Sequence, residues 1–477
     1  MKYLLILPGV LVLLVLIAVV RTLVSPRKTS DYQPPQADEA EALRLAGKLS
    51  KMIQVDTTSH AGGDDPARFR AFHKTLAELF PRVFSQLEKT EIDGNLLFYW
   101  KGRSQERPIL LMSHQDVVPA EGAWSHAPFS GDIADGKVWG RGASDTKCSV
   151  MAFFEAAEQL LAEGYTPPTD VYLASSCTEE WAGDGAPKLV AELQRRGVEL
   201  FLVCDEGGAI ISEPIGGIPG NFAMVGVFEK GKADVKFTAK STGGHASAPG
   251  KHTPIARLAA FVTEVETHSP FKKKLLPEVA AMFRTLAPYA SSFGLRLLLG
   301  NLWLFAPLLK LVLPAVSAQA GAMLRTTIAF TTQSGSDAYN VIPQEATLGA
   351  NMRFIPHQGE QESLAIIQTL AEKHGLSTEV LHANDFTPPV DIHGEAFTLF
   401  TRVIGETFSG LAASPYVMTG ATDAQFYQPI CKSCIRFAPV IYGPEQMRGM
   451  HGLNENIEYR CLPGAVRFYQ NLIRAEK

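Results

Sequence analysis

Two segments of the sequence set acidic and histidine side chains directly after apolar, strand-like runs. The run 109–112 leads to His114, with Asp116 two residues further on, and a second run leads to the adjacent acids Glu179 and Glu180. A histidine followed closely by a carboxylate suits a metal ligand whose second ring nitrogen is held by that acid. Adjacent carboxylates repel each other, so the pair is costly unless a cation or a shared proton compensates. Each motif alone is more often an ordinary polar loop, and only the combination indicates a metal site.

Three further residues complete a candidate ligand set. Asp145 lies in the glycine-rich segment 140–147 before a helical pattern, Asp205 follows a third apolar run, and His451 occurs late in the chain. Active sites of open α/β sheets gather at the carboxyl ends of the strands, so we expect these residues to converge. Two imidazoles and several carboxylates form the nitrogen and oxygen set that binds zinc, and one acid remains to act as a base.

The elements that must position these residues follow an α/β pattern. Helical patterns such as 149–162 alternate with the short apolar runs, which favours a largely parallel sheet. From Glu229 the texture changes, and residues 233–239 alternate polar and apolar side chains like an antiparallel strand with one wet face. A helix over 254–266 and a second alternating strand over 346–354 belong to the same region. The pattern predicts a smaller domain inserted into a larger one.

Length and composition agree with two domains and argue against nucleic acid as a partner. The chain has 477 residues, 46% of them hydrophobic, and a net charge of -5 without long basic runs, so no nucleic-acid footprint is expected. Only Cys431 and Cys434 of the six cysteines form a C-x-x-C pair, and buried free thiols are expected. The predicted order is an anchor over 1–24, a linker over 25–37, a catalytic domain over 38–228 and 357–477, and the insert over 229–356.

The N-terminus predicts a membrane anchor. Residues 3–20 are an apolar run without a charge, whose helical length approaches the ~30 Å hydrocarbon core of a bilayer. A cleavable signal peptide is the rival, but the sequence before Arg21 lacks the small-x-small site of such peptides. We therefore expect an uncleaved single-pass transmembrane helix, a proline-containing linker over 25–37, and a catalytic part outside the cytoplasm.

A second apolar stretch, 286–316, lies inside the predicted insert. It is interrupted by Pro288, Pro307 and Pro314, and no piece reaches the ~20 residues of a membrane span. Three interpretations stay open: a buried or dimer-contact helical hairpin, a segment that touches the membrane interface, or an apolar wall for a substrate.

The ordered motifs resemble those of the di-zinc peptidases that include aminoacylase, carboxypeptidase S, carnosinase, glutamate carboxypeptidase and succinyl-diaminopimelate desuccinylase. The resemblance covers the chain from about Ala40 to the end. It is carried by the segments 113–119, 124–131, 140–147, 179–180, 205–208, 229–231, 243–249, 340–343 and 451–455. The His-Gln-Asp variant, the N-terminal anchor and the apolar stretch look most like the branch of carboxypeptidase S and N-fatty-acyl-amino-acid synthase/hydrolase. This resemblance implies a di-zinc exopeptidase-like domain with an inserted ferredoxin-like α+β domain for dimerisation or as a lid.

The resemblance also implies the metal ligands by position. Asp145 corresponds to the carboxylate that bridges two zinc ions in each subunit, with His114 and Asp205 at one ion and Glu180 and His451 at the other. Cobalt or manganese could take the place of zinc in the same ligand set.

Further roles come from the same correspondence. Asp116 would orient His114, and Glu179 would be the general base. The resemblance assigns substrate binding to five residues: His245, Asn340, Arg353, Gly420 and Thr422. His245 and Asn340 match residues that reach the active site of a partner subunit, and Arg353 matches the residue that holds the substrate carboxylate.

These implications lead to one expected function and two alternatives. We expect zinc-dependent hydrolysis of an amide bond that releases an amino acid with a free carboxylate, from N-acyl amino acids, fatty-acyl forms included, or from short peptides. The alternative enzyme is a carboxypeptidase or dipeptidase of the carboxypeptidase S type. A more remote alternative is an inactive, membrane-held binding protein on the same fold, against which the retained base Glu179 and five ligands argue. A homodimer through the insert is expected.

Overall fold

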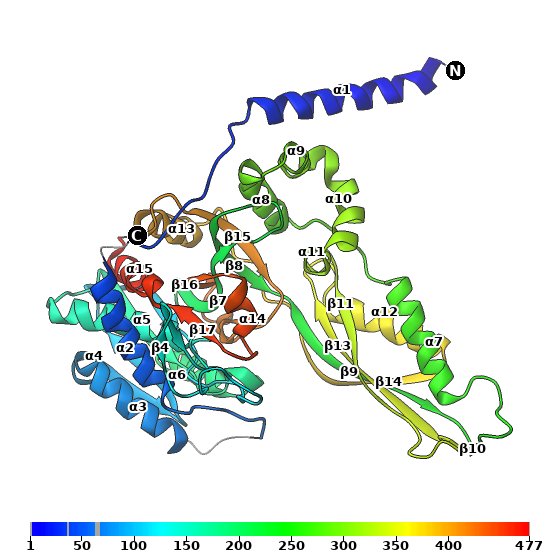
Figure 1. Cartoon of the computed structure of the whole chain (residues 1–477), viewed down its shortest axis with the longest axis horizontal. Coiled ribbons are helices and arrows are strands. Elements are labelled where there is room, and N and C mark those ends of the chain that lie inside the picture. Colours follow the sequence, from blue (N-terminus) through cyan, green and yellow to red (C-terminus); the bar gives the residue numbers. More distant parts are fainter. Residues whose placement is uncertain (1, 36–37, 63–66, 477) are drawn as a thin grey trace.

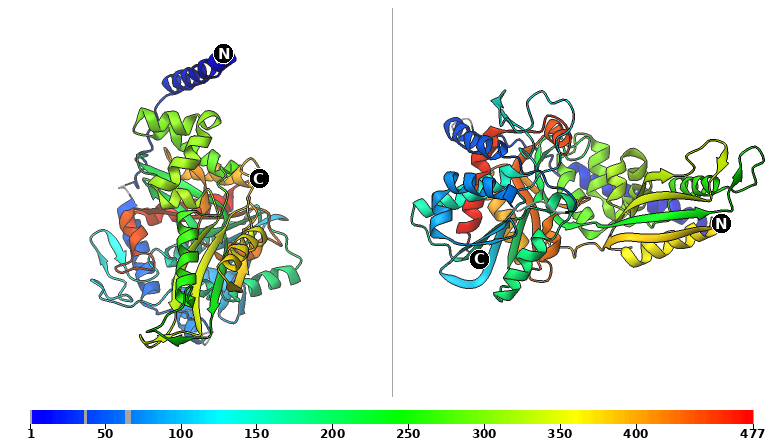
Figure 2. Two further views of the ribbon diagram at one scale, coloured as in Figure 1. Left: turned by 90° about the vertical axis from the view of Figure 1, so that its right-hand side faces the viewer. Right: turned by 90° about the horizontal axis from the view of Figure 1, so that it is seen from below.

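The computed structural model describes residues 2–35, 38–62 and 67–476. Figure 1 shows a larger domain built on a central sheet, a smaller domain beside it, and the N-terminal helix α1 (Lys2–Val24) standing off at one end. The right-hand view of Figure 2 also shows the two domains side by side. The predicted α/β class is confirmed.

The larger domain has an eight-stranded sheet in the order β1-β2-β6-β3-β7-β16-β8-β15. The strands are β1 (Glu88–Ile92), β2 (Asn95–Trp100), β3 (Ser104–Met112), β6 (Thr169–Ser175), β7 (Leu202–Ser212), β8 (Asn221–Glu229), β15 (Ala412–Met418) and β16 (Cys434–Tyr442). The central strands β6, β3, β7 and β16 pair in parallel, whereas β1, β2 and β8 bring antiparallel pairings. Every position of β6 is buried, because helices cover the sheet on both faces.

Alternate side chains of the central strands enter two separate cores. Ile109 and Leu111 of β3 belong to the large core, and Leu110 and Met112 belong to the smaller core on the opposite face. The large core is covered by α2 (Glu39–Ile53), α3 (Ala67–Leu79), α4 (Pro81–Gln86), α5 (Lys147–Ala162), α13 (Glu395–Thr407) and α15 (Leu462–Arg474). The opposite face is covered by α6 (Gly185–Arg195) and the short turn η4 (Asp423–Tyr427). All six cysteines are buried and free, as expected.

The smaller domain has an antiparallel sheet in the order β11-β13-β9-β14. Its elements are β9 (Gly231–Lys240), α7 (Pro254–Thr267), β11 (Thr327–Ser334), β13 (Glu345–Phe354), α12 (Glu360–Lys373) and β14 (Leu376–Asn384). The buried side of the sheet packs on α7 and α12, and burial alternates along β9 as the sequence pattern indicated. This strand and helix order and this sheet order form the ferredoxin-like arrangement.

The smaller domain ends later than the sequence predicted. We expected residues after 356 to belong to the larger domain, but α12 packs in the smaller core and β14 pairs with β9 along its length. The pairing partner of an amphipathic strand depends on tertiary contacts, so the boundary near Asn384 could not be read from periodicity.

The apolar stretch belongs to a helical segment that packs on the larger domain. Its elements are α8 (Pro277–Leu286), η3 (Ala287–Tyr289), α9 (Phe293–Gly300), α10 (Leu302–Val316) and α11 (Ala318–Ala322). Leu286, Leu299 and Leu309 are buried in the large core, which favours the buried-hairpin interpretation for one side of the segment. The other side stays exposed, with Trp303 and Leu311 among its residues.

Within the described part of the chain, no single helix is long and apolar enough to cross a bilayer. The described apolar part of α1 is Gly9–Val24, which is shorter than a span. Helix α9 together with residues 302–315 of α10 has the length and composition of a span, but the two pieces are bent by 109°. The predicted single transmembrane helix over residues 1–24 is therefore not confirmed.

Candidate active site

The candidate ligands meet at one edge of the large sheet. His114 follows the end of β3, and Glu179 and Glu180 lie in the short turn η2 (Glu179–Trp181) after β6. Asp145 immediately precedes the turn into α5. His451 approaches from the loop after α14 (Pro444–Gly449). Residues that are far apart in the sequence thus converge where parallel strands end, as the sequence indicated.

Asp145 lies between the two histidines. Its Oδ1 atom is 3.1 Å from Nε2 of His114, and its Oδ2 atom is 3.2 Å from Nε2 of His451. Nε2 of His451 is also 3.0 Å from Oε2 of Glu180. Ligand atoms of His114, Asp145 and Glu180 all lie within 4.8 Å of one another. One carboxylate with an imidazole on each oxygen is the arrangement expected of a ligand shared by two ions.

Asp116 holds both His114 and the acidic turn in position. The Nδ1 atom of His114 is 2.9 Å from the backbone oxygen of Asp116 and 3.4 Å from its carboxylate, which leaves Nε2 facing Asp145. The carboxylate of Asp116 also accepts hydrogen bonds from the backbone nitrogens of Glu179 and Glu180, at 3.3 and 3.2 Å. A single buried acid therefore fixes the ring orientation of one ligand and the backbone of its acidic neighbours.

Asp205 lies within strand β7 rather than after it. The sequence placed the end of this strand at Cys204, but β7 continues to Ser212 and exchanges its partner on the way. It pairs with β3 up to Cys204 and with β8 from Ala209 onward. Asp205 thus lies where the β3 pairing ends, and its carboxylate accepts backbone hydrogen bonds from Glu206 and Ala424, each at 2.8 Å. Asp205 is not among the three residues, His114, Asp145 and Glu180, whose ligand atoms all lie within 4.8 Å of one another.

The site gathers more carboxylates than its imidazoles can neutralise. Burial raises the pKa of Glu179 and of Glu206 well above the usual range and raises the pKa of Asp205 to about 6. Hydrogen bonds that its ring donates to the carboxylates of Asp145 and Glu180 raise the pKa of His451 to about 10. The Oε1 atom of Glu180 is buried and has no hydrogen-bond partner among the described residues. A buried, acid-rich cluster with an unpaired oxygen fits divalent cations, which would stabilise every one of these anionic forms.

Glu455 is a supporting residue to which the sequence reasoning gave no role. Its buried carboxylate accepts hydrogen bonds from the backbone nitrogens of Ser144 (2.8 Å) and Asp145 (2.9 Å) and pairs with Arg141 at 2.7 Å. The loop that presents Asp145 is therefore held by a carboxylate from the other end of the chain. Its place at the end of the segment 451–455 was the only signal in the sequence.

Thr422 belongs to a buried ion pair behind the site. Its hydroxyl donates to Oε1 of Glu229 at 2.5 Å, and the same oxygen accepts from Nε of Arg436 at 2.7 Å. Gly420 is exposed in the same loop. Thr422 thus contacts the structural support of the site, and the sequence reasoning did not single out Arg436.

The remaining predicted substrate residues, His245, Asn340 and Arg353, lie in the smaller domain. His245 is in β10 (Gly244–His245), which pairs with β12 (Val341–Ile342), and the backbone oxygen of Asn340 accepts from Ala246 at 3.0 Å. Figure 1 shows β10 at the end of the smaller sheet far from the larger domain. Arg353 is on β13, where its Nε donates to the side chain of Asn351 at 3.0 Å.

A cavity with about 660 Å³ of empty space, part of it open to solvent, lies beside Asp145 and Glu206. Its apolar and aromatic wall includes Ile211, Met224, Tyr416, Tyr442, Met447 and Met450. Gln319 of α11, at the end of the apolar segment, also lines it and donates to the hydroxyl of Tyr416 at 3.5 Å. The predicted ligands therefore adjoin a largely apolar cavity.

Comparisons with known proteins agree with this fold and site. Residues 110–475 match the model of Peptidase family M20/M25/M40. The N-fatty-acyl-amino acid synthase/hydrolase PM20D1 of Xenopus tropicalis is 33% identical, over 97% of this chain and 93% of that protein. Probable carboxypeptidase S-like 2 of Dictyostelium discoideum is 31% identical, over 98% of this chain and 92% of that protein.

Solved structures share the fold at lower identity. The M20 family metallo-carboxypeptidase Sso-CP2 from Sulfolobus solfataricus superposes with a TM-score of 0.65 at 16% identity, covering 89% of this chain and 98% of that one. The sequence match and the fold thus point to the same group of proteins. The chain belongs to Peptidase family M20/M25/M40 and is a metallohydrolase that acts on amide or peptide bonds.

Proposed function

We propose that this protein hydrolyses N-acyl amino acids, long-chain forms included, and releases the amino acid with its free carboxylate. The observation that carries the proposal is the apolar cavity that adjoins Asp145 and Glu206. A ligand pocket with an apolar wall and a few polar groups at one end suits a substrate with an apolar chain and a reactive amide. The 33% identity to an N-fatty-acyl-amino acid synthase/hydrolase supports the same substrate class.

The residues present fit two zinc ions. Asp145 would bridge them, His114 and Asp205 would hold one, and Glu180 and His451 would hold the other. When bound, the ions would activate a water and polarise the amide carbonyl. The contact of His114 Nδ1 with Asp116 supports this assignment, because it leaves the Nε2 lone pair for coordination.

Glu179 is the proposed general base. Its carboxylate lies 3.9 Å from Nε2 of His114, next to the candidate ligands, and is largely buried. A carboxylate in this position can take a proton from the attacking water and pass it to the leaving amine. Arg353 would hold the substrate carboxylate, since a guanidinium fork matches its two oxygens.

Variants of Glu179 test its role. Glu179→Gln and Glu179→Ala should bind as much zinc as the unaltered protein yet lose hydrolysis, because a base that is not a ligand contributes to rate rather than to metal affinity. Zinc content by elemental analysis and turnover are measured on the same preparations. Normal turnover would assign the base elsewhere, and loss of zinc would make Glu179 a ligand.

An acyl-length series tests the substrate class. We would measure kcat/KM for N-acetyl, N-octanoyl and N-oleoyl forms of one amino acid, each below its micelle concentration. Each methylene buried in the cavity adds up to ~0.8 kcal/mol, so kcat/KM should rise steeply with chain length. A flat or falling series, with faster hydrolysis of dipeptides, would favour the carboxypeptidase alternative, which the similarity to a carboxypeptidase S-like protein supports.

A variant of the cavity wall tests whether the acyl chain lies in this cavity. Ile211 is half-buried in the wall, so Ile211→Trp should shorten the cavity without reaching the metal ligands. The variant should lose the preference for N-oleoyl over N-acetyl substrates and keep the N-acetyl rate, which serves as its internal control. An unchanged preference would place the acyl chain elsewhere.

We also propose that the protein forms a homodimer and is attached to a membrane. A homodimer through the smaller domain would bring His245 and Asn340 to the active site of a partner, which accounts for their distance from their own cluster. Attachment to a membrane through α1 is supported by the exposed apolar side chains of that helix. We further propose that the catalytic part lies outside the cytoplasm. Protease protection of the catalytic domain in intact cells would test the orientation.

A further inference from the structure

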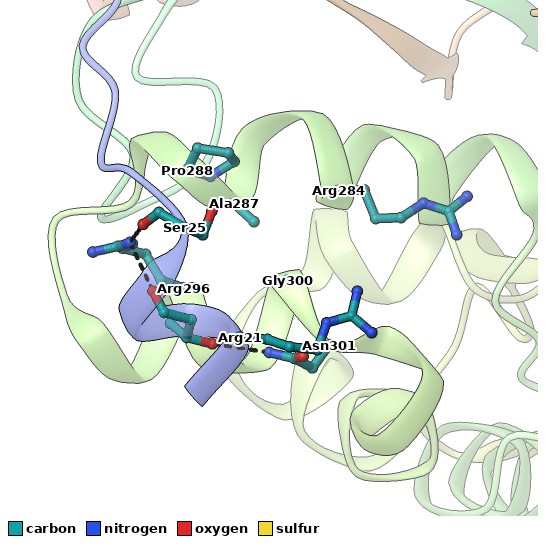
Figure 3. A pocket seen from close by; sticks show the side chains of 9 residues that line it. Arg21, Ser25, Arg284, Ala287, Pro288, Arg296, Gly300 and Asn301 are labelled. Atoms are coloured by element: carbon teal, nitrogen blue, oxygen red, sulfur yellow. Dashed lines mark hydrogen bonds between the residues drawn. The ribbon is translucent and has the colours of Figure 1, made fainter. Parts of the chain in front are cut away.

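A polar pocket lies where the end of α1 meets the helical segment. It has about 570 Å³ of empty space, part of it open to solvent, between the last turn of α1, the end of α8 and helix α9. Three arginines line it, one from each element: Arg21, Arg284 and Arg296. Figure 3 shows them around the pocket, with Arg296 turned toward Ser25. The pocket shares no lining residue with the apolar cavity beside Asp145 and Glu206, and it contains none of the candidate metal ligands.

Hydrogen bonds fix the shape of this pocket. Nη2 of Arg296 donates to the backbone oxygens of Thr22 (3.1 Å) and Ser25 (2.6 Å). The side-chain amide of Asn301 donates to the hydroxyl of Thr22 at 3.0 Å, and Thr22 is itself buried. The end of α1 is therefore docked on α9 and α10 rather than held by a loose linker. Arg296 is occupied by this docking, whereas Arg21 and Arg284 are exposed.

The charges at the pocket are all of one sign. None of the nine residues that line it is acidic. The sequence has no Asp or Glu before Asp31 and none between Glu278 and Asp337, so the segments that build the pocket supply only positive charge. Guanidinium groups repel one another when gathered, and an anion between them removes that cost. Their planar, forked donors match the oxygens of a phosphate group in particular.

Helices α1 and α10, which meet near this cationic pocket, also carry exposed apolar side chains. Leu23 and Val24 of α1 and Trp303, Leu308 and Leu311 of α10 are all exposed. Figure 1 and Figure 2 show α1, α9 and α10 at the same end of the molecule. Tryptophan beside basic residues is typical of protein surfaces at the level of lipid headgroups. A free phosphate would gain nothing from these side chains, whereas a phospholipid would contact them with its acyl chains.

We propose that this pocket binds the phosphate headgroup of an anionic phospholipid, with the lipid chains against α1 and α10. Basic pockets between membrane-associated helices recognise anionic headgroups by the same combination of charge and depth. Arg21 and Arg284 would contact the phosphate, and Arg296 would keep α1 and α9 together around it. The site is separate from catalysis, so this inference does not depend on the acyl-amino-acid substrate.

Direct binding measurements distinguish the headgroup from other anions. The full chain, purified in an uncharged detergent, is titrated with dioctanoyl phosphatidylglycerol, with dioctanoyl phosphatidylcholine and with inorganic phosphate, and bound ligand is counted by native mass spectrometry. We expect saturable binding of one phosphatidylglycerol, with at least tenfold weaker binding of phosphatidylcholine and of phosphate. Equal binding of the two lipids would refute headgroup recognition. Phosphate binding as strong as that of phosphatidylglycerol would make this a free-anion site and overturn the lipid proposal.

A matched pair of variants separates the pocket from general attraction to positive charge. Arg21→Gln/Arg284→Gln removes two charges from the pocket, and Arg27→Gln/Lys28→Gln removes two charges from the adjacent exposed segment that does not line it. Loss of two charged hydrogen bonds should weaken phosphatidylglycerol binding by about tenfold or more in the first variant, with less than a twofold change in the second. An unchanged circular-dichroism spectrum and an unchanged thermal unfolding midpoint confirm that each variant is folded. Equal losses in both variants would refute a defined site.

Discussion

Arg436→Met should destabilise the larger domain because it leaves a buried carboxylate without its positively charged partner. Arg436 and Glu229 have side-chain exposures of 0% and 1%, and Nε of the arginine lies 2.7 Å from Oε1 of the glutamate. Nη1 of Arg436 also donates to the backbone oxygen of Cys434. Methionine retains most of the apolar stem, so the main loss is electrostatic. Removing one partner of a buried pair costs about 3–5 kcal/mol, and we expect a loss of unfolding free energy in that range.

The double variant Glu229→Gln/Arg436→Met tests whether the loss of stability comes from an unpaired buried charge. With both charges gone no uncompensated ion remains, so the double variant should recover about 2 kcal/mol or more of the loss. Urea unfolding followed by tryptophan fluorescence reports the larger domain, since none of the five tryptophans lies in the elements of the smaller sheet or its two helices. A loss below about 1 kcal/mol for Arg436→Met would refute the explanation by an unpaired buried charge. So would a double variant as unstable as the sum of Arg436→Met and Glu229→Gln measured singly.

Three further predictions concern the site. Chelation should abolish hydrolysis while far-ultraviolet circular dichroism persists, and added zinc should restore turnover; activity that survives complete metal removal would contradict the metal-dependent mechanism. Inactive His245→Ala mixed with inactive Glu179→Ala should regain activity if subunits exchange, and no recovery despite proven exchange would place His245 outside a shared site. Glu455→Ala removes the acceptor for the backbone nitrogen of Asp145, so zinc affinity should fall about 10–100-fold. The affinity is measured by competition with a chelating dye, and an unchanged value would show that the Asp145 loop keeps its position without Glu455.

Much of the fold and the candidate site could be predicted because both depend on local patterns. Strand and helix periodicities gave the α/β sheet and the alternating strands of the smaller domain. His114 and Glu180 follow buried strands, and the carboxyl ends of parallel strands meet at one edge whatever the details of packing. Asp145 and His451 reach the same edge from loops, and Asp145 contacts both histidines there.

Other features depended on contacts between distant segments. The partner of β14 decided where the smaller domain ends, and the exchange of partners along β7 decided that Asp205 lies inside a strand. Glu455 contacts the Asp145 loop across more than 300 positions of sequence, and no local pattern encodes such a contact.

The sequence by itself determined which side chains could bind metal and which faces of the elements are apolar, because these are properties of residue type and period. Only the tertiary structure decided that an apolar cavity adjoins Asp145 and that three arginines from separate helices enclose one pocket. A cavity is the space left between packed elements, and its position depends on how every neighbouring side chain fits, which no single segment specifies.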